Sequence, residues 1–243
     1  MLGSSNIKAI FFDLGQTLVE ELTMLALCMQ DSLKKNLPYA NTDYKELAYA
    51  WGYQTHQLFM KAREKEFMSA QKIHLQALKQ LLRTESIPVT DRQAHSMVEE
   101  VWQAFIERNK IYPDTIPTLQ KLKQSGYRLG IITDCDLDVA EGILQKHRLM
   151  NFFDVKIISG EIRAYKPSSI MFCKALELVD CSPNKGIYVG DSEIDIKGAK
   201  EIGLVTVIVD RETMRTSQMG IVPDFRINML SEIPKILLTL DNR

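Results

Sequence analysis

Four short stretches of this chain place acidic, basic or hydroxyl side chains where they could do chemistry. The first is the apolar run 7–12, which ends on Asp13 and is followed by Gly15. The run predicts a short buried strand, and an acid that ends such a strand lies where parallel α/β sheets place their ligand sites. From the residues alone, Asp13 could act as a nucleophile, a metal ligand or a helix cap.

Two further stretches also follow predicted strands. Thr133 ends the apolar run 129–132. Its hydroxyl and the neighbouring N–H groups could bind an oxyanion such as phosphate, although a threonine at a strand end is often purely structural. Lys166 precedes Pro167 and a predicted helix. Most lysines are solvated surface residues, but the proline restricts the direction of this one.

The fourth stretch contains a pair of acids. Asp191 follows the buried run 187–190, and Asp195 comes four residues later. The pair is compatible with a helix entry capped by Ser192. It is also compatible with a cation site, because two acids at the end of a buried strand repel each other unless a cation neutralises them. Oxygen ligands favour Mg²⁺, which takes one or two carboxylates and leaves room for water and phosphate.

The elements that must position these residues fall into two groups. Apolar residues recur at helical spacing from 20 to 108, which predicts four to five amphipathic helices with no strand among them. From 113 onward, helices alternate with strands, and this alternation predicts right-handed crossovers and a parallel sheet. The predicted strands cover 128–133, 155–159, 186–190, 205–209 and, at the edge, 225–227; the predicted helices cover 20–37, 44–68, 69–83, 91–108, 116–124, 138–147, 168–178, 195–201 and 231–240.

The predicted fold is therefore α/β, with a parallel-sheet, Rossmann-like core and an inserted all-α unit. The core domain comprises 1–19 and 110–243, and the helical domain comprises 20–109. Because the insert leaves the core at the carboxyl end of the first strand, we expect it to lie above the ligand crevice of the sheet as a cap or lid.

Composition narrows the class of protein. The 243 residues are 45% hydrophobic and 25% charged, with a net charge of -1, which is ordinary for a globular protein and argues against nucleic-acid or membrane partners. The four cysteines show no zinc spacing, and with no signal peptide they favour a cytoplasmic protein. The sequence does not distinguish a monomer from a homodimer.

Taken in order, the four stretches resemble the signatures of the haloacid dehalogenase superfamily, the phosphoaspartate-forming hydrolases. The resemblance covers essentially the whole chain, and the helical insert is similar to that of the subfamily with a helical-bundle cap. The signatures are Asp13-x-x-x-Thr17-Leu18, Thr133, Lys166-Pro167 and Gly190-Asp191-Ser192-x-x-Asp195.

The resemblance implies a Mg²⁺-dependent phosphatase that acts on a small phosphorylated metabolite. It implies that Asp13 is the nucleophile and forms an aspartyl-phosphate, which water then hydrolyses. It also implies that Mg²⁺ is held by Asp13, Asp191 and the backbone carbonyl of Gly15.

The same resemblance implies the phosphate-binding group. Thr133 and Lys166 are the implied catalytic partners of the nucleophile, and Thr133, Asp134 and Lys166 form the implied phosphate-binding set. Asp195 is expected to order a metal-bound water or Lys166 from behind the site. The residues alone give no physical reason for the negative charge of Asp134 beside a phosphoryl group.

One position departs from the family pattern. Typical phosphatases of the family have a second Asp two residues after the nucleophile, as general acid and base, and here that residue is Gly15. General acid–base catalysis contributes roughly 10²–10⁴-fold, so we expect slow turnover of alkyl phosphates unless water or the insert supplies the proton. His56 and His74, otherwise plain helix residues, are candidate donors. The departure leaves open a 2-haloacid dehalogenase or a non-catalytic relative that binds a phosphometabolite.

Three acids, Asp134, Asp136 and Asp138, superficially resemble the start of a calcium loop. The glycine and the terminal glutamate of such a loop are missing. A helix N-terminus enriched in acids explains the three residues better.

Overall fold

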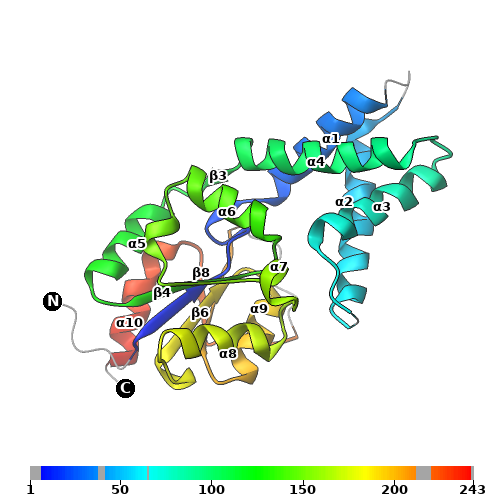
Figure 1. The fold of residues 1–243 in the computed structure, drawn as a ribbon. Coiled ribbons are helices and arrows are strands. Elements are labelled where there is room, and N and C mark those ends of the chain that lie inside the picture. The colour runs from blue at the N-terminus through cyan, green and yellow to red at the C-terminus, as the bar shows by residue number, and fades with distance from the viewer. Residues whose placement is uncertain (1–6, 38–41, 65, 212–219, 242–243) are drawn as a thin grey trace.

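A six-stranded sheet forms the centre of the molecule (Figure 1). The computed structural model describes residues 7–37, 42–64, 66–211 and 220–241. All neighbouring strands are parallel, in the order β5-β4-β1-β6-β7-β8, which confirms the predicted α/β core. The strands are β1 (Ala9–Phe12), β4 (Arg128–Thr133), β5 (Val155–Ile158), β6 (Gly186–Gly190), β7 (Val205–Val209) and β8 (Phe225–Ile227).

Helices cover both faces of this sheet, with α5 and α10 on one face and α8 and α9 on the other (Figure 1). Side chains of β1 alternate between the two layers. Ile10 and Phe12 belong to the cluster that includes Leu237 of α10, whereas Phe11 packs in the cluster of Phe172 from α8. The helices of the core are α5 (Thr115–Gln124), α6 (Leu137–Lys146), α7 (Ser159–Ile162), α8 (Ser169–Leu178), α9 (Glu193–Glu201) and α10 (Ile233–Asp241).

A four-helix unit, here called the helical insert, interrupts the core after its first strand. Its helices pack on one another around buried Trp51 and Phe105, and α4 also contacts α6 of the core. The predicted helix over 44–68 ends earlier, at Ala62, and Ser69 caps the next helix by accepting a hydrogen bond from the Lys72 N–H. The helices are α1 (Leu22–Asn36), α2 (Tyr44–Ala62), α3 (Ala70–Thr84) and α4 (Asp91–Arg108).

The insert is attached through a short antiparallel ribbon, which the sequence did not predict. Strand β2 (Val19–Glu20) pairs with β3 (Lys110–Ile111), so the chain enters and leaves the insert at one place. Two-residue strands have no periodicity that a sequence pattern could reveal. Within the described residues, no helix combines the length and the apolar character that a bilayer crossing requires.

Candidate active site

The predicted site residues meet at one edge of the sheet. Strands β4, β1 and β6 are neighbours, and because they are parallel their carboxyl ends bring Thr133, Asp13 and Asp191 together. A cavity of about 370 Å³ lies over these ends and is lined by residues of both the core and the helical insert. The insert contributes His56, Phe59, Arg63, Trp102 and Phe105 to its lining.

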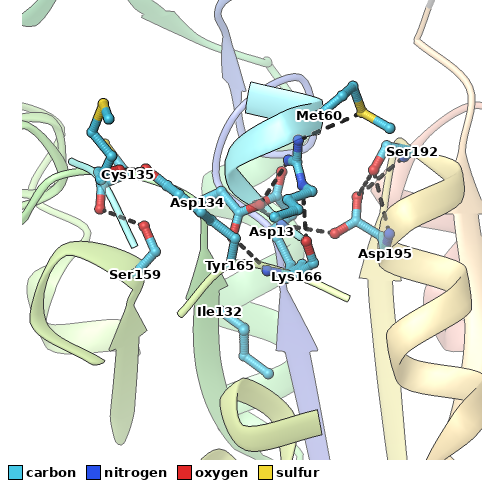
Figure 2. Close-up of polar contacts among 12 residues, drawn as sticks. Asp13, Met60, Ile132, Asp134, Cys135, Ser159, Tyr165, Lys166, Ser192 and Asp195 are labelled. Atoms are coloured by element: carbon cyan, nitrogen blue, oxygen red, sulfur yellow. Dashed lines mark hydrogen bonds and ion pairs between the residues drawn. The ribbon is translucent and has the colours of Figure 1, made fainter. Parts of the chain in front are cut away.

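Lys166 is a buried cation held between two carboxylates (Figure 2). Its Nζ donates to Asp13 Oδ1 at 2.6 Å and to Asp195 Oδ1 at 2.7 Å, and it lies 3.3 Å from the Tyr188 hydroxyl. Burial opposes the charge, but the Asp13 and Asp195 carboxylates together raise the pKa of Lys166 well above its usual value. The ammonium group therefore stays charged and fixed beside Asp13, unlike the solvated surface lysine that is the common alternative.

Asp195 is held by donors on all sides. Its Oδ1 accepts from Lys166 and from the Tyr188 hydroxyl at 2.8 Å. Its Oδ2 accepts from the Ser192 N–H at 3.1 Å and the Ser192 hydroxyl at 2.6 Å, completing a capping box at the start of α9. The helix-entry interpretation of this pair is thus confirmed for Asp195. Gly190 gives Asp195 its space, since a Cβ there would lie 2.5 Å from the Asp195 carboxyl carbon.

The three acids Asp13, Asp191 and Asp195 could share a cation, because one oxygen of each lies within 4.8 Å of the others. Burial raises the pKa of Asp13 to about 7 against the opposing effect of Lys166. Burial, reinforced by the charges of Asp195 and Asp13, holds the pKa of Asp191 well above its usual range. An oxygen-only, acid-rich cluster of this kind fits a hard divalent cation such as Mg²⁺, whose charge would cancel the repulsion.

Thr133 and Asp134 differ in their surroundings. Thr133 is buried at the end of β4 and lines the cavity. The Asp134 carboxylate pairs with the Arg63 guanidinium at 2.9 Å and accepts from the Lys166 N–H at 2.9 Å. Arg63 also donates from Nε to the Lys166 carbonyl at 2.9 Å. Asp134 therefore connects the insert to the backbone of the lysine, which accounts for an acid at this position.

The neighbouring acids also contact the insert rather than a calcium ion. The Asp136 carboxylate accepts from the N–H groups of Ala70 at 3.0 Å and Gln71 at 2.8 Å, at the N-terminus of α3. Asp138 accepts from the Gln71 side chain at 2.9 Å. Asp136 makes no side-chain cap on its own helix, α6. Asp136 and Asp138 both lie at the N-terminus of α6, as predicted, but the Asp136 carboxylate caps α3 of the insert instead of its own helix.

The two candidate histidines have different environments. His74 is buried among aromatic rings of the insert, with its ring centre 4.8 Å from that of Trp102. Burial lowers the pKa of His74 to about 3, so His74 is a neutral core residue. The prediction of His74 as a candidate proton donor is therefore wrong. His56 is exposed on α2 and lines the cavity.

Three residues of the site were missed from the sequence. Tyr188 could have been noticed as a phenol in the middle of an otherwise aliphatic buried strand. Arg63 and Glu21 line the cavity, but both belong to or border the helical insert, and no local pattern indicates that they approach Asp13.

Comparison with known proteins identifies the class to which this fold and site belong. The sequence model of the haloacid dehalogenase-like hydrolases matches residues 10–209, so the chain belongs to this family and is a hydrolase. A glyceraldehyde 3-phosphate phosphatase from Methanopyrus kandleri is 27% identical over 241 residues, covering 96% of this chain and 98% of that protein.

Two solved structures share the fold. The HAD-hydrolase YfnB from Bacillus subtilis, bound to magnesium, gives a TM-score of 0.78 at 21% identity, covering 95% of this chain and 98% of that one. An L-2-haloacid dehalogenase from Xanthobacter autotrophicus gives a TM-score of 0.75 at 19% identity with the same coverage of 95% and 98%. At these identities the likeness concerns the fold.

Proposed function

We propose that this protein is a Mg²⁺-dependent phosphatase that hydrolyses a small phosphoric monoester through an aspartyl-phosphate on Asp13. The observation that carries the proposal is the grouping of a buried lysine, 2.6 Å from Asp13, with a second, half-buried acid, Asp191, within reach of the same cation. A carboxylate attacks a phosphate dianion only when the negative charges are neutralised, and this grouping supplies the means. The full-length relative with a phosphatase name supports the same reaction class.

In this proposal each residue has a distinct task. Asp13, Asp191 and the Gly15 carbonyl would hold Mg²⁺, which when bound neutralises charge on the phosphoryl oxygens. The second carboxylate oxygen of Asp13 attacks phosphorus, and Lys166 stabilises the developing charge. Thr133 hydrogen-bonds a phosphoryl oxygen from the end of β4.

The remaining acids position these groups. Both Asp195 oxygens accept hydrogen bonds from Lys166, Tyr188 and Ser192, so Asp195 fixes the lysine rather than the ion. The Asp134 carboxylate is engaged with Arg63 and the Lys166 backbone. Its expected contact with phosphate stays a prediction.

The cavity indicates what kind of ester fits. Its volume of about 370 Å³ is at the small end of ligand sites. Among the described residues that line the cavity, the lysine and arginine side chains are those of Lys166 and Arg63. Each of the two is already paired with a carboxylate. The walls that the insert supplies are mainly aromatic. We therefore propose a small substrate whose leaving group is uncharged, with the insert acting as the cap that encloses it.

A panel of phosphate monoesters tests the proposal. We expect phosphate release that requires Mg²⁺, stops on addition of EDTA and falls at least about 10³-fold in Asp13→Asn. The exposed Asp180→Asn is the matched control and should keep full activity. No release from any monoester with Mg²⁺ would refute the proposal. Halide release from a 2-haloacid without metal would favour the dehalogenase, and ligand binding unaffected by Asp13→Asn would favour a non-catalytic binder.

A further inference from the structure

The space beside Gly15 is filled by another side chain. A Cβ built on Gly15 would lie 1.6 Å from Glu21 Oε2 and 2.7 Å from the Glu21 carboxyl carbon. The backbone of Gly15 is not in the left-handed region, so its conformation does not require glycine. The Glu21 carboxylate occupies the room that a side chain at residue 15 would take, two residues from Asp13, so the two groups cannot fill this space together.

The chain holds Glu21 in this position through Gln16. The buried Gln16 side chain accepts from the Glu21 N–H at 2.7 Å and from the Leu22 N–H at 3.2 Å. These bonds fold the start of α1 back onto the loop that follows Asp13. Glu21 is the N-cap residue of α1, yet its side chain makes no cap bond to that helix. The carboxylate is instead directed to the floor of the cavity, which it lines together with Asp13 and Asp191.

From this geometry we propose that Glu21 is the acid–base residue of the phosphoryl transfer. Glu21 lies immediately before the first helix of the insert and not in the loop that follows Asp13. The inference rests on the proposed function. As the Asp13 oxygen bonds to phosphorus and the phosphorus–ester oxygen bond breaks, the Glu21 carboxyl group gives its proton to the departing alkoxide. The alcohol leaves, and Glu21 remains as a carboxylate.

The second half of the reaction returns the proton to the Glu21 carboxylate. Water attacks the phosphorus of the aspartyl-phosphate while the Glu21 carboxylate removes one proton from it. The bond between phosphorus and the Asp13 oxygen breaks, which releases inorganic phosphate and the free Asp13 carboxylate. Glu21 is again protonated, so no other reactant is required.

The nature of the leaving group distinguishes a catalytic role of Glu21 from a purely structural one. A p-nitrophenolate departs readily as an anion, whereas an alkoxide needs a proton. We expect Glu21→Gln to lower kcat/KM for an alkyl phosphate such as glycerol phosphate by about 10²–10⁴-fold, and that for p-nitrophenyl phosphate by less than about tenfold. His56→Gln changes the remaining candidate donor on the cavity wall and should leave the ratio of the two substrates unchanged. An unchanged ratio in Glu21→Gln, or a changed one in His56→Gln alone, would overturn the inference.

A rescue experiment tests the position directly. Gly15→Asp alone would displace the Glu21 carboxylate from this space, so the test removes Glu21 as well. The double variant Gly15→Asp/Glu21→Ala returns an acid to the same space and should exceed Glu21→Ala by at least about tenfold on the alkyl ester. A double variant no more active than Glu21→Ala contradicts the proposal.

A binding measurement shows whether Glu21→Gln is folded and still binds a phosphate mimic. It therefore separates a wrong role for Glu21 from a damaged fold or a wrong proposed function. Beryllium fluoride with Mg²⁺ mimics a phosphorylated aspartate, and it should raise the Tm of Glu21→Gln as much as that of the wild type. If the wild type cleaves no monoester of the panel, the proposed function fails and the role of Glu21 with it. If the wild type is active and the substrate ratio does not respond to Glu21→Gln, the role of Glu21 alone is refuted.

Discussion

Replacing Asp13 with asparagine should make the metal-free protein more stable at pH 8. Burial raises the pKa of Asp13 from 3.8 to about 7, so the folded state resists ionisation of this group. At 1.36 kcal/mol for each tenfold change in proton affinity, this corresponds to about 4 kcal/mol of unfolding free energy lost when the carboxyl group is ionised. Asparagine keeps the size of the side chain and removes the charge.

The sign of the pH dependence follows from the same numbers. A raised carboxyl pKa favours folding below 3.8, and this contribution is lost as the pH rises through about 7. The advantage of Asp13→Asn should therefore be largest at pH 8, about 4 kcal/mol, and shrink to less than half of that at pH 5. Mg²⁺ should reduce the difference at pH 8, because it stabilises the wild type by binding its ionised carboxylate.

Urea unfolding followed by circular dichroism in EDTA, at pH 8 and pH 5, measures this difference. Asp154→Asn is a control of opposite sign. Burial opposes ionisation of Asp154, but hydrogen bonds from Lys123 and the Leu129 N–H outweigh it and lower its pKa, so this variant should be less stable at pH 8. If Asp13→Asn is no more stable than the wild type at pH 8, the reasoning on the buried charge is refuted.

Three further substitutions test the packing around the site, and a fourth, in α2, serves as a control. Lys166→Met leaves two buried carboxylates facing each other, and it should lower the unfolding free energy by about 3 kcal/mol and abolish phosphate release. Gly190→Ala puts a Cβ 2.5 Å from the Asp195 carboxyl carbon and should cost about 1–3 kcal/mol in urea unfolding; Gly52→Ala, with nothing within 4 Å, should instead stabilise α2 by about 0.5–1 kcal/mol. Arg63→Gln removes the ion pair between insert and core and should raise KM more than it lowers kcat in steady-state assays; equal KM values would contradict this.

Much of the core was predictable because its strands are buried on both faces. Continuous apolar runs predicted 128–133, 186–190 and 205–209, and the structure has strands with these bounds. The predicted edge strand 225–227, which is only partly buried, also has the expected bounds. The predicted parallel sheet placed the strand ends at one edge, and the family resemblance implied that Asp13, Thr133 and Asp191 meet there; the neighbouring order of β4, β1 and β6 comes from the structure.

The contacts between the two units could not be predicted in the same way. Arg63 lies at the end of α2, and its approach to Asp134 depends on how the insert packs against the core. Glu21 is an ordinary acid in the sequence, and only the folded loop places it against Gly15. Asp136 was expected to serve its own helix, but its partners on α3 are more than sixty residues away along the chain. Long-range contacts of this kind have no signal in local spacing.

The β2–β3 ribbon joins the helical insert to the core at one place, so the insert could be exchanged for another as a single unit. Val19 pairs with Ile111 and Glu20 with Lys110, so the sequence between them begins and ends on adjacent rungs, and the strand order of the core does not depend on its length. The helices that form the cavity roof can therefore be replaced between these rungs while Asp13, Thr133 and Asp191 stay on the core, whereas Glu21, the first residue after β2, is exchanged together with the roof. The same two strand pairs are the positions at which the helical insert of one relative could be joined to the core of another.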